Sequence, residues 1–564
     1  MPRTISIGNQ GFDVIRSKNY FYVDKTNFIK EWWESGDEVT LITRPRRFGK
    51  TLNMSMLECF FSNRYADRTE LFDGLNIWKD EEYRKLQGTY PVIALSFAAV
   101  KADNLGDAKL QIKAQIAKVY DDNRYLVDSG VLSPNEKNKF EGVTMYMGDA
   151  EASMALNDLC LYMSRYYGKK VVVLMDEYDT PMQEAYINGY WNDFTAFIRS
   201  LFNAAFKTNV SLERAVMTGI TRVSKESIFS DLNNLRVVTA TSDMYADSFG
   251  FTENEVMASL EEYGLSDRFT DVKEWYDGFI FGLHRDIYNP WSITYFLKEK
   301  QLRPYWASTS SNGLINKLIR TGTPEIKEMM EQLMNGEDIV VNFDEQIVFD
   351  QLDQNEASIW SLLLASGYLK ADSVEYRGVT LEPWYHLSIT NMETVSMFSN
   401  MFKSWFGGAQ GNYNKFVDAL LRGNVDEMNS YMNEVSLMTF SSFDTGKHPS
   451  GKSEPERFYH GFVLGLLVEL NDRYQVLSNR ESGYGRYDVM LVPKIHDLPG
   501  IVMEFKVHDP EKEETLAETV DKALKQIDEK QYDAELLAKG NSINNIRHYG
   551  FAFEGKRVLI GQEM

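Results

Sequence analysis

A glycine, a lysine and a threonine stand together at Gly49-Lys50-Thr51, at the end of the run TRPRRFGKT. Loops of the form G-x-x-x-x-G-K-[ST] bind nucleotide phosphates with their main-chain N–H groups and with the positive end of the following helix. The lysine of such a loop reaches the outer phosphates, and the hydroxyl coordinates Mg²⁺. Arg44 stands where the motif has its first glycine, so the sequence predicts an altered phosphate-binding loop.

Two carboxylates, Asp176 and Glu177, follow directly after the aliphatic run VVVLM. In nucleotide hydrolysis, one acid at such a position holds the Mg²⁺ ion and a second orients or deprotonates the attacking water. We therefore predict that Asp176 is a metal ligand together with Thr51, and that Glu177 is catalytic. The alternative is a chance Gly-Lys-Thr in a turn and a solvated, acidic strand end.

The elements that must position these residues alternate along the first half of the chain. Aliphatic runs at 38–43, 90–97, 170–179 and 214–220 predict strands, and helix-compatible stretches separate them. This alternation predicts a mainly parallel sheet with helices on both faces. Ligands bind at the carboxyl ends of such strands. The loop follows the first strand and the acidic pair ends the third, so both are expected at the same edge of the sheet.

Several longer runs together resemble the bacterial AAA-ATPase-like proteins. They are FYVDKTNFI (21–29), TRPRRFGKTL (43–52), LMDEYDTP (174–181), TGITRVSKESIFSDLNNL (218–235), WYDGFIFG (275–282) and IYNPWSI (287–293). In that family the loop begins Arg-Pro-Arg-Arg-Phe-Gly-Lys, so Arg44 is the family's own variant. The resemblance implies ATP and Mg²⁺, with Thr218 reading the γ-phosphate. It also implies that Arg222 neutralises transition-state charge, in its own subunit or in a neighbour within a homo-oligomer. A strand-end β-branched residue and an ordinary surface arginine are the alternatives.

The nucleotide contacts expected from the loop span its whole length. They are Arg44, Pro45, Arg46, Arg47, Phe48, Gly49, Lys50 and Thr51. Pro45 holds the preceding residue extended and removes one N–H group from the cradle. Arg46 and Arg47 are expected to replace the lost dipole with full charge beside the phosphates. ATP binding is therefore expected, whereas fast hydrolysis does not follow from this loop.

A second set of chemically active residues lies near the C-terminus, where Asp488 precedes the pair Glu504 and Lys506. Side chains two apart on a strand share a face, so the run GIVMEFKV (500–507) presents Glu504 and Lys506 on the same side. Asp488 joins them if its own strand is the hairpin neighbour. Helices are expected before and after these two strands.

This order of helix, two strands and helix resembles the PD-(D/E)xK nuclease superfamily, a domain that AAA-ATPase-like proteins often carry at the C-terminus. The resemblance implies that Asp488 and Glu504 bind Mg²⁺ or Mn²⁺ and that Lys506 positions the nucleophile or the phosphate. It further implies that Glu456, on the preceding helix, completes the metal shell, and that Gln526, on the following helix, is catalytic. Nucleic acid is the implied substrate, with DNA favoured over RNA. A solvated carboxylate–lysine pair is the alternative.

Composition limits these functions. The chain has 564 residues and a net charge of −22, from 82 acidic and 60 basic residues, which excludes a chain-wide basic surface for nucleic acid. Any contact with nucleic acid must therefore be local. The two cysteines supply neither a disulfide framework nor a cysteine-rich zinc site. No apolar signal region or membrane-spanning run is visible, so no membrane partner and a cytoplasmic location are expected.

Changes in sequence pattern divide the chain into three expected parts. Residues 1–305 form an α/β AAA-like P-loop ATPase domain with a helical lid, and residues 443–564 an α/β PD-(D/E)xK nuclease-like domain. Residues 306–442 form a mainly helical middle region, in which a helix, a hairpin and a helix suggest a winged-helix-like module by fold analogy. The expected function is ATP binding, with hydrolysis, that controls a metal-dependent nuclease. The alternative is a nucleotide-dependent switch or scaffold whose C-terminal domain binds nucleic acid or protein without cutting.

Overall fold

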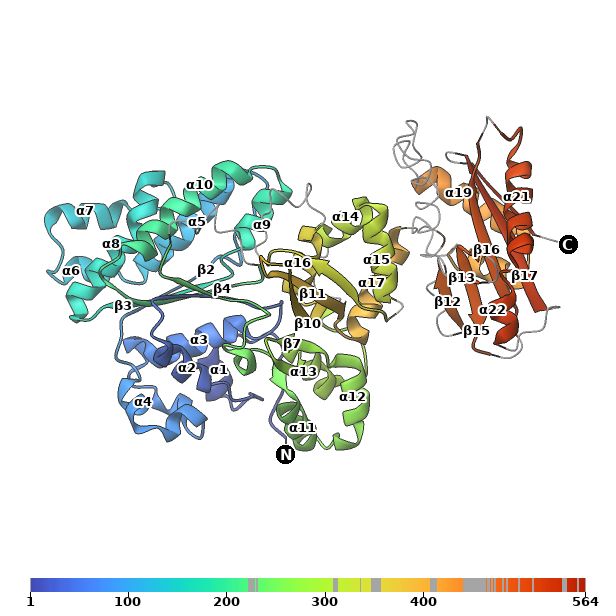
Figure 1. The fold of residues 1–564 in the computed structure, drawn as a ribbon. Helices are drawn as coiled ribbons and strands as arrows, with labels where there is room; N and C mark the ends of the chain where they lie inside the picture. Colours follow the sequence, from blue (N-terminus) through green and yellow to red (C-terminus); the bar gives the residue numbers. More distant parts are fainter. Residues whose placement is uncertain are drawn as a thin grey trace. The chain divides into compact units, whose positions relative to one another are not determined.

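The computed structural model consists of two compact units (Figure 1). The first comprises Met1–Leu318 with Gly336–Val395, and the second comprises Ile319–Asn335 with Ser396–Met564. The structure describes residues 2–221, 229, 232–307, 313–334, 336–345, 357–405, 413–439, 463, 467, 470, 473–478, 481–482, 485–495, 498–509, 512–539, 545–554 and 557–562.

A five-stranded sheet forms the centre of the first unit, in the order β2-β3-β4-β1-β5. All of its strand pairs are parallel. Its members are β1 (Val39–Thr43), β2 (Val92–Ser96), β3 (Val171–Asp176), β4 (Leu212–Gly219) and β5 (Leu235–Val238). Every residue of β1 and β3 is buried, as expected for strands that read as continuous apolar runs. The predicted parallel α/β sheet is therefore confirmed.

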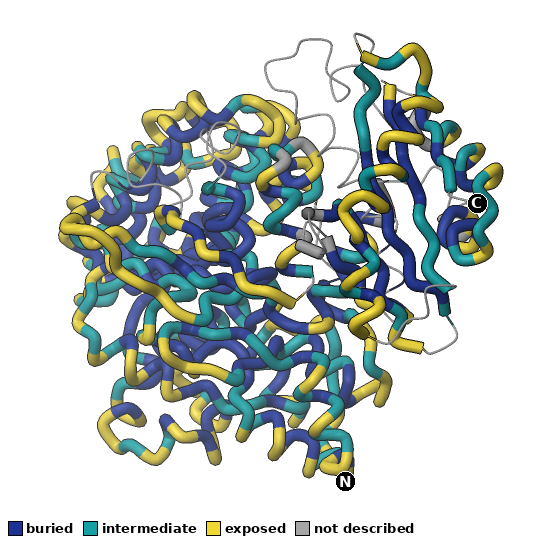
Figure 2. The backbone as a smooth tube through the Cα atoms, turned by 45° about the vertical axis from the view of Figure 1, so that its right-hand side comes forward, coloured by how far each residue is buried: buried dark blue, intermediate teal, exposed yellow. Residues whose placement is uncertain are grey.

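Helices cover both faces of this sheet (Figure 1). One face carries α1 (Phe12–Ser17), α2 (Asn27–Ser35) and α3 (Lys50–Phe61), whose apolar side chains form one core cluster with residues of β1, β3 and β4. The other carries α5 (Leu105–Asp121), α8 (Asp149–Tyr167) and α10 (Trp191–Phe202). The remaining helices of this region are α4 (Glu81–Leu86), α6 (Tyr125–Asp128), α7 (Pro134–Gly142) and α9 (Thr180–Ile187). Figure 2 shows the backbone coloured by burial, with buried segments in the interior and exposed segments at the outer turns.

A smaller subdomain follows the sheet and is called here the lid. It comprises β6 (Phe251–Thr252), α11 (Glu253–Glu262), α12 (Phe269–Tyr276), β7 (Phe279–Phe281), β8 (His284–Tyr288) and α13 (Pro290–Glu299). Its strands form an antiparallel sheet in the order β6-β8-β7. Thr252 and Glu255 close a capping box at the start of α11, which fixes the direction in which the chain enters the lid.

The structure contains the expected helix–hairpin–helix order, which begins with α16 (Ala357–Ala365) and ends with α17 (Met392–Trp405). The hairpin is β10 (Leu369–Arg377) with β11 (Glu382–Ile389), and β9 (Ile339–Asn342) adds a third antiparallel strand in the order β10-β11-β9. Two further helices precede this sheet, α14 (Gly313–Thr321) and α15 (Pro324–Met334).

The second unit contains a mixed sheet in the order β12-β15-β16-β17-β18. Its members are β12 (Tyr474–Ser478), β15 (Val489–Pro493), β16 (Gly500–Val507), β17 (Ile546–Glu554) and β18 (Arg557–Gln562), beside the short hairpin β13 (Glu481–Ser482) and β14 (Gly485–Arg486). Only the β16–β17 pair is parallel within this sheet as described. Odd-numbered residues of β15 and β16 enter one core cluster and even-numbered residues the other.

Two pairs of helices cover the faces of this second sheet. The first pair is α18 (Tyr413–Arg422) and α19 (Val425–Thr439), which share the odd-numbered core, and the second is α21 (Leu516–Lys530) and α22 (Ala534–Ala538), which share the even-numbered core. The expected division placed α18 and α19 in the middle region instead. Their apolar residues share one core cluster with strands of this sheet, so the compact unit extends upstream of residue 443.

The outer edge of β18 is closed by two asparagine side chains of α19. Asn429 donates to the carbonyl oxygen of Ile560 at 2.8 Å and accepts from the N–H group of the same residue at 2.7 Å. Asn433 does the same with Val558, at 2.7 and 3.0 Å. The two amides thus take the place of a further strand and leave no open ladder at these residues.

Among the described residues, no helix combines the length and the apolar character needed to span a bilayer.

Candidate nucleotide and nuclease sites

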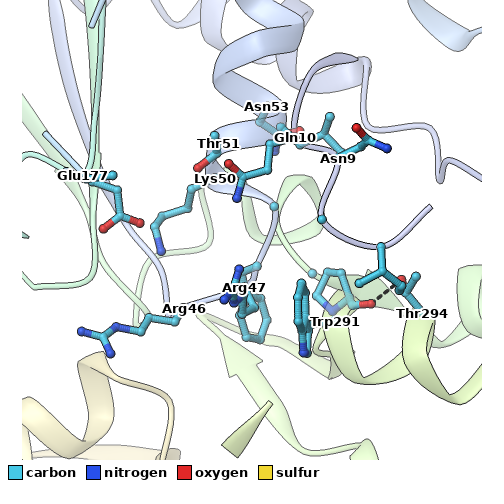
Figure 3. A pocket seen from close by; sticks show the side chains of 18 of the residues that line it. Asn9, Gln10, Arg46, Arg47, Lys50, Thr51, Asn53, Glu177, Trp291 and Thr294 are labelled. Carbon is cyan, nitrogen blue, oxygen red and sulfur yellow. Dashed lines mark hydrogen bonds between the residues drawn. The ribbon is translucent and has the colours of Figure 1, made fainter. Parts of the chain in front are cut away.

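The loop between β1 and α3 borders a cavity of about 750 Å³ in the first unit (Figure 3). Gly49 is the residue before α3 and has φ +82°, a left-handed conformation that suits glycine. Arg46, Arg47, Lys50 and Thr51 all line the cavity, as does Glu177, which follows β3. The sheet therefore brings the altered loop and the acidic pair to one edge.

Asp176 accepts hydrogen bonds from two hydroxyl groups that lie far apart in the sequence. One carboxylate oxygen accepts from the hydroxyl of Thr51 at 2.7 Å, and the other accepts from the hydroxyl of Thr218. Only 5% of Asp176 is exposed, and burial raises the pKa of its carboxyl. A carboxylate beside a loop threonine provides the hard oxygen donors that Mg²⁺ prefers, so these residues fit the expected metal.

Lys50 is buried beside these acids, with 4% of its surface exposed. Its ammonium group donates to the carbonyl oxygens of Arg44 and Pro45, both at 2.9 Å. Burial lowers the pKa of Lys50, while the nearby Glu177 and Asp176 oppose this shift. The loop's own carbonyl groups thus hold the lysine at the cavity wall.

Glu177 adopts φ +54°, a left-handed conformation that is uncommon for a residue with a side chain. Its carboxylate accepts a hydrogen bond of 3.0 Å from the hydroxyl of Thr180, the first residue of α9. Asp179, two residues further on, is fully buried and stabilises this turn. Its carboxylate accepts from the N–H groups of Ile220 and Thr221 at 2.9 and 2.8 Å. The sequence analysis did not predict a role for Thr180, although a hydroxyl three residues after Glu177 is a local signal of a hydrogen bond to that carboxylate.

The side chain of Arg44 does not lie where the expected role as a phosphate contact would require it. Its guanidinium is fully buried and donates to the carbonyl oxygens of Thr239, at 2.7 Å, and Met244, at 3.2 Å. It also lies 4.4 Å from the centre of the Phe281 ring, and burial lowers its pKa to about 9. Its main-chain N–H group donates to Gly219. Arg44 therefore connects the loop to the segment that leads into the lid, and neither it nor Pro45 is among the residues that line the cavity.

The other predicted loop residues divide between packing and the cavity. Phe48 is 1% exposed and contacts the rings of Phe279 and Phe281, with centres 4.7 and 5.5 Å apart. The guanidinium of Arg47 lies 4.2 Å over the ring of Trp291 in α13, so the loop contacts the lid directly. Arg222 lies outside the described residues.

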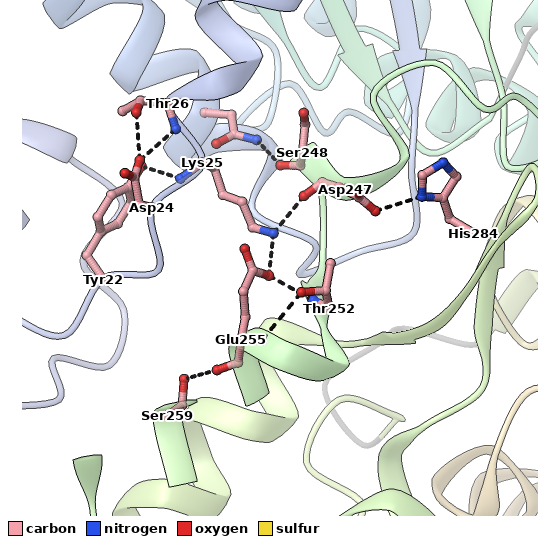
Figure 4. Close-up of polar contacts among 11 residues, drawn as sticks. Tyr22, Asp24, Lys25, Thr26, Asp247, Ser248, Thr252, Glu255, Ser259 and His284 are labelled. Atoms are coloured by element: carbon pink, nitrogen blue, oxygen red, sulfur yellow. Dashed lines mark hydrogen bonds and ion pairs between the residues drawn. The ribbon is translucent and has the colours of Figure 1, made fainter. Parts of the chain in front are cut away.

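Lys25, which precedes the phosphate loop, also contacts the lid (Figure 4). Its ammonium group contacts the carboxylate of Glu255 and the carbonyl oxygen of Asp247, both at 2.6 Å. Glu255 also closes the capping box of α11, so one carboxylate serves both contacts. Sequence reasoning treated this lysine only as part of a family motif.

In the second unit, strand pairing brings Asp488 opposite Glu504. Val489 pairs with Met503, and continuing this antiparallel register by one residue puts the two acids across from each other. The N–H group of Phe505 donates to Asp488 at 2.7 Å. Glu504 is 1% exposed and accepts from Lys506 at 2.8 Å.

Gln526 completes this cluster from α21. Its amide nitrogen donates to Glu504 and, at 3.0 Å, to the hydroxyl of Tyr532. Burial raises the pKa of Tyr532, and the charges of Glu504, Asp488 and Lys506 also act on it. The structure thus brings four predicted residues together and adds a tyrosine that sequence reasoning missed. Glu456 lies outside the described residues.

Two facing carboxylates supply hard oxygen ligands of the kind that Mg²⁺ and Mn²⁺ take. Within the part of the chain that the structure describes, no group of three or more His, Cys, Asp or Glu side chains is arranged to hold a metal ion. Asp488 and Glu504 therefore fit a metal that takes its other ligands from water, from a substrate phosphate or from outside the described residues.

Comparison with known proteins finds a family match in the region around each of these sites. Residues 6–229 match the family model described as predicted AAA-ATPase, and residues 454–563 match that of the PD-(D/E)XK nuclease superfamily. An "Uncharacterized protein in vnfD 5'region" from Azotobacter chroococcum mcd 1 is 25% identical over 563 residues, covering 96% of this chain and 95% of the relative. The chain thus joins an N-terminal region that matches the predicted AAA-ATPase family model to a C-terminal region that matches the PD-(D/E)XK nuclease superfamily model.

Proposed function

We propose that the first unit binds and hydrolyses ATP at the cavity beside the 44–51 loop. The observation that carries this proposal is the cluster in which Asp176 contacts the hydroxyl groups of Thr51 and Thr218 next to the buried Lys50. A cation, two hydroxyls and a carboxylate at the carboxyl edge of a parallel sheet match the needs of a bound nucleoside triphosphate and its metal.

Each residue has a distinct task in this proposal. Lys50 exchanges the carbonyl oxygens of its own loop for the outer phosphates, and Arg46 adds positive charge beside them. Thr51 and Asp176 would hold Mg²⁺, which would offset the charge of the phosphates. Glu177 accepts a proton from, or orients, the attacking water.

For the second unit we propose hydrolysis of a nucleic-acid phosphodiester, with DNA favoured over RNA. Asp488 and Glu504 would hold a divalent cation, which would supply an activated water and offset charge at the scissile phosphate. Lys506 positions the nucleophile or the phosphate. Gln526 fixes the orientation of Glu504 through the hydrogen bond that it donates. ATP bound in the first unit is proposed to control this cleavage.

One assay tests the whole proposal. The purified chain is incubated with circular DNA, linear DNA and RNA, with Mg²⁺, Mn²⁺ or a chelator, and with or without ATP. Cleavage is expected only with a divalent cation and is expected to change with ATP. Asp488→Ala should abolish cleavage, whereas Lys50→Ala should abolish only the effect of ATP.

The outcomes separate the nuclease from the alternative function. If no substrate is cut under any condition while ATP still binds, the C-terminal unit acts as a binding module of a nucleotide-dependent switch. If cleavage persists unchanged in Asp488→Ala, the assignment of the nuclease site is wrong. If Lys50→Ala binds ATP as tightly as the unchanged chain, the assignment of the loop is wrong.

A further inference from the structure

His508 extends the row of polar side chains that Glu504 and Lys506 form on β16. Residues two apart on a strand share a face, so His508 joins this row if the chain is still extended there. The N–H group of His508 donates to the carbonyl oxygen of Phe553 at 2.9 Å, which continues the pairing of β16 with β17 beyond Val507. The ring of His508 therefore lies on the face of the sheet that holds the nuclease cluster.

The helix α21 contacts both ends of this row. Gln526 donates to Glu504, and the hydroxyl of Thr519, on the same helix, lies 3.0 Å from Nδ1 of His508. The seven residues from Thr519 to Gln526 span about 10.5 Å of helix, or two turns, so both side chains face β16. The four residues from Glu504 to His508 span about 13 Å of strand. These similar lengths allow one helix to hold the nuclease cluster and His508 together.

A buried carboxylate, that of Glu513, anchors the ring of His508. The two side chains are 7% and 8% exposed, and Nδ1 lies 3.3 Å from a carboxylate oxygen. The same carboxylate accepts from the hydroxyl of Thr519 and, at 2.7 Å, from the ammonium group of Lys522. Burial by itself would raise the pKa of Glu513, but the hydrogen bonds outweigh it and lower this pKa to about 2. Glu513 is therefore ionised and can only accept hydrogen bonds.

The hydroxyl of Thr519 determines which nitrogen of His508 carries a proton. A threonine hydroxyl has one hydrogen, and Thr519 donates it to Glu513. Its oxygen must therefore accept from His508, so Nδ1 carries a hydrogen. Nε2 then has the lone pair of a neutral ring, or becomes a second donor when the ring is protonated. Within the described part of the chain, Nε2 has no hydrogen-bond partner, and it is not closed off from solvent.

We propose that His508 is a phosphate-binding residue of the C-terminal unit and that it contacts the phosphodiester next to the scissile one. Nε2 of the protonated ring donates to a phosphate oxygen, while Thr519 and Glu513 hold Nδ1. Distance assigns it to the neighbouring phosphate, because His508 is about 13 Å along the strand from Glu504 and about 6.6 Å from Lys506. This inference rests on the proposed cleavage of nucleic acid and adds a contact one nucleotide away from the bond that is cut.

The test measures how salt affects binding of a labelled DNA duplex by the full-length chain. Fluorescence anisotropy is recorded with Ca²⁺, at about pH 6, below the ordinary pKa of histidine. Because the chain has a net charge of −22, its affinity for a polyanion depends on local cations. Each phosphate contact contributes about 0.9 to the slope of log affinity against log salt concentration. Loss of the His508 contact is therefore visible as a smaller slope.

The substitution His508→Asn separates the two ring nitrogens. Asparagine places an amide nitrogen where Nδ1 stands, so it keeps the contact with Thr519 and removes only Nε2. DNA binding at low salt should weaken about tenfold, the low end for a hydrogen bond between charged groups, and the slope should fall by about one contact. In cleavage assays with Mg²⁺, KM should rise by a similar factor while kcat stays within about twofold, because His508 does not touch the reacting atoms.

His548 of β17 provides the matched control, because its Nε2 already contacts Asp533 at 2.7 Å. His548→Asn should leave the salt slope unchanged. His508→Gln also lacks the charge of the ring and should lose the same slope, so the test does not depend on the folding of one variant.

Three results would contradict the contact proposed for His508. They are an unchanged slope and affinity in both His508 variants, an equal loss of slope in His548→Asn, and a loss of kcat at unchanged KM. The last result would instead make His508 a support of the catalytic cluster. If the unchanged chain neither binds nor cuts DNA or RNA, the proposed nuclease itself is refuted, and the contact proposed for His508 falls with it.

Discussion

Replacing Thr180 with valine tests how Glu177 is held for catalysis. Valine keeps the shape of threonine and removes only the hydroxyl that donates to the carboxylate at 3.0 Å. Thr180 is a positioning residue, because in the proposed mechanism it acts through Glu177 and does not touch ATP. The left-handed backbone of Glu177, at φ +54°, makes this support matter, since the side chain leaves a strained turn.

The size of the effect follows from the bond that is lost. A hydrogen bond to a charged group contributes about 1.5–3 kcal/mol. If the whole of that contribution serves the orientation of Glu177, the turnover of ATP falls by about 10- to 100-fold, at roughly 1.4 kcal/mol per factor of ten. ATP affinity should stay within about twofold, because the loop and Lys50 are unchanged.

Phosphate release at saturating ATP measures this effect, and calorimetry measures binding. Glu177→Gln gives the reference for full loss of the base, and Thr180→Ser is the matched control because serine keeps the hydroxyl. Serine should restore most of the turnover that valine removes. A valine variant that turns over ATP at the normal rate, or that loses affinity and turnover in equal measure, would refute the positioning role.

Further predictions concern both units. Lys50→Ala should weaken ATP binding at least 100-fold by calorimetry, and equal affinity would remove the loop from the site. Arg44→Ala should lower the free energy of unfolding by about 2–4 kcal/mol, since it leaves buried carbonyl groups without a donor; a thermal midpoint equal to that of the unchanged chain would contradict this. Glu393 is buried in the first turn of α17, and burial raises its pKa to about 7, above its value in the unfolded chain. Between about pH 4.5 and 7 the folded chain therefore binds the extra proton, and its stability falls as pH rises. Glu393→Gln should flatten this fall of up to about 3 kcal/mol, measured as unfolding midpoints across that range, and parallel curves would exclude Glu393 as the source. Lys506→Ala should abolish nucleic-acid cleavage while ATP binding persists, and intact cleavage on gels would exclude Lys506.

The features that the sequence predicted well depend on local pattern. The parallel sheet follows from aliphatic runs that alternate with helices. Two of these runs form β1 and β3, and the loops with the candidate site residues follow these strands. Glu504 and Lys506 share a face because strand side chains alternate. Asp488 required one further assumption, the hairpin pairing of β15 with β16, which the register supports.

The features that the sequence did not predict depend on contacts between distant segments. Arg44 reads as a phosphate contact in its motif, yet its guanidinium donates to carbonyl groups about two hundred residues further along the chain. The first residues of the chain line the cavity, and Arg3 contacts Glu262 of the lid, 259 residues further along the chain. Nothing in the local pattern of Tyr532 indicates that its hydroxyl contacts Gln526.

The asparagines of α19 decide where the C-terminal unit can be cut free. A fragment that begins at residue 443 would lack Asn429 and Asn433, and the N–H and carbonyl groups of Val558 and Ile560 would stand exposed along β18. Such an edge is a template for strand addition from another molecule, so we expect that fragment to aggregate. A fragment that begins at residue 413 keeps both helices and their core. It is the longer of the two pieces and the one that should remain monodisperse, so the proposed nuclease chemistry can be tested in it apart from ATP.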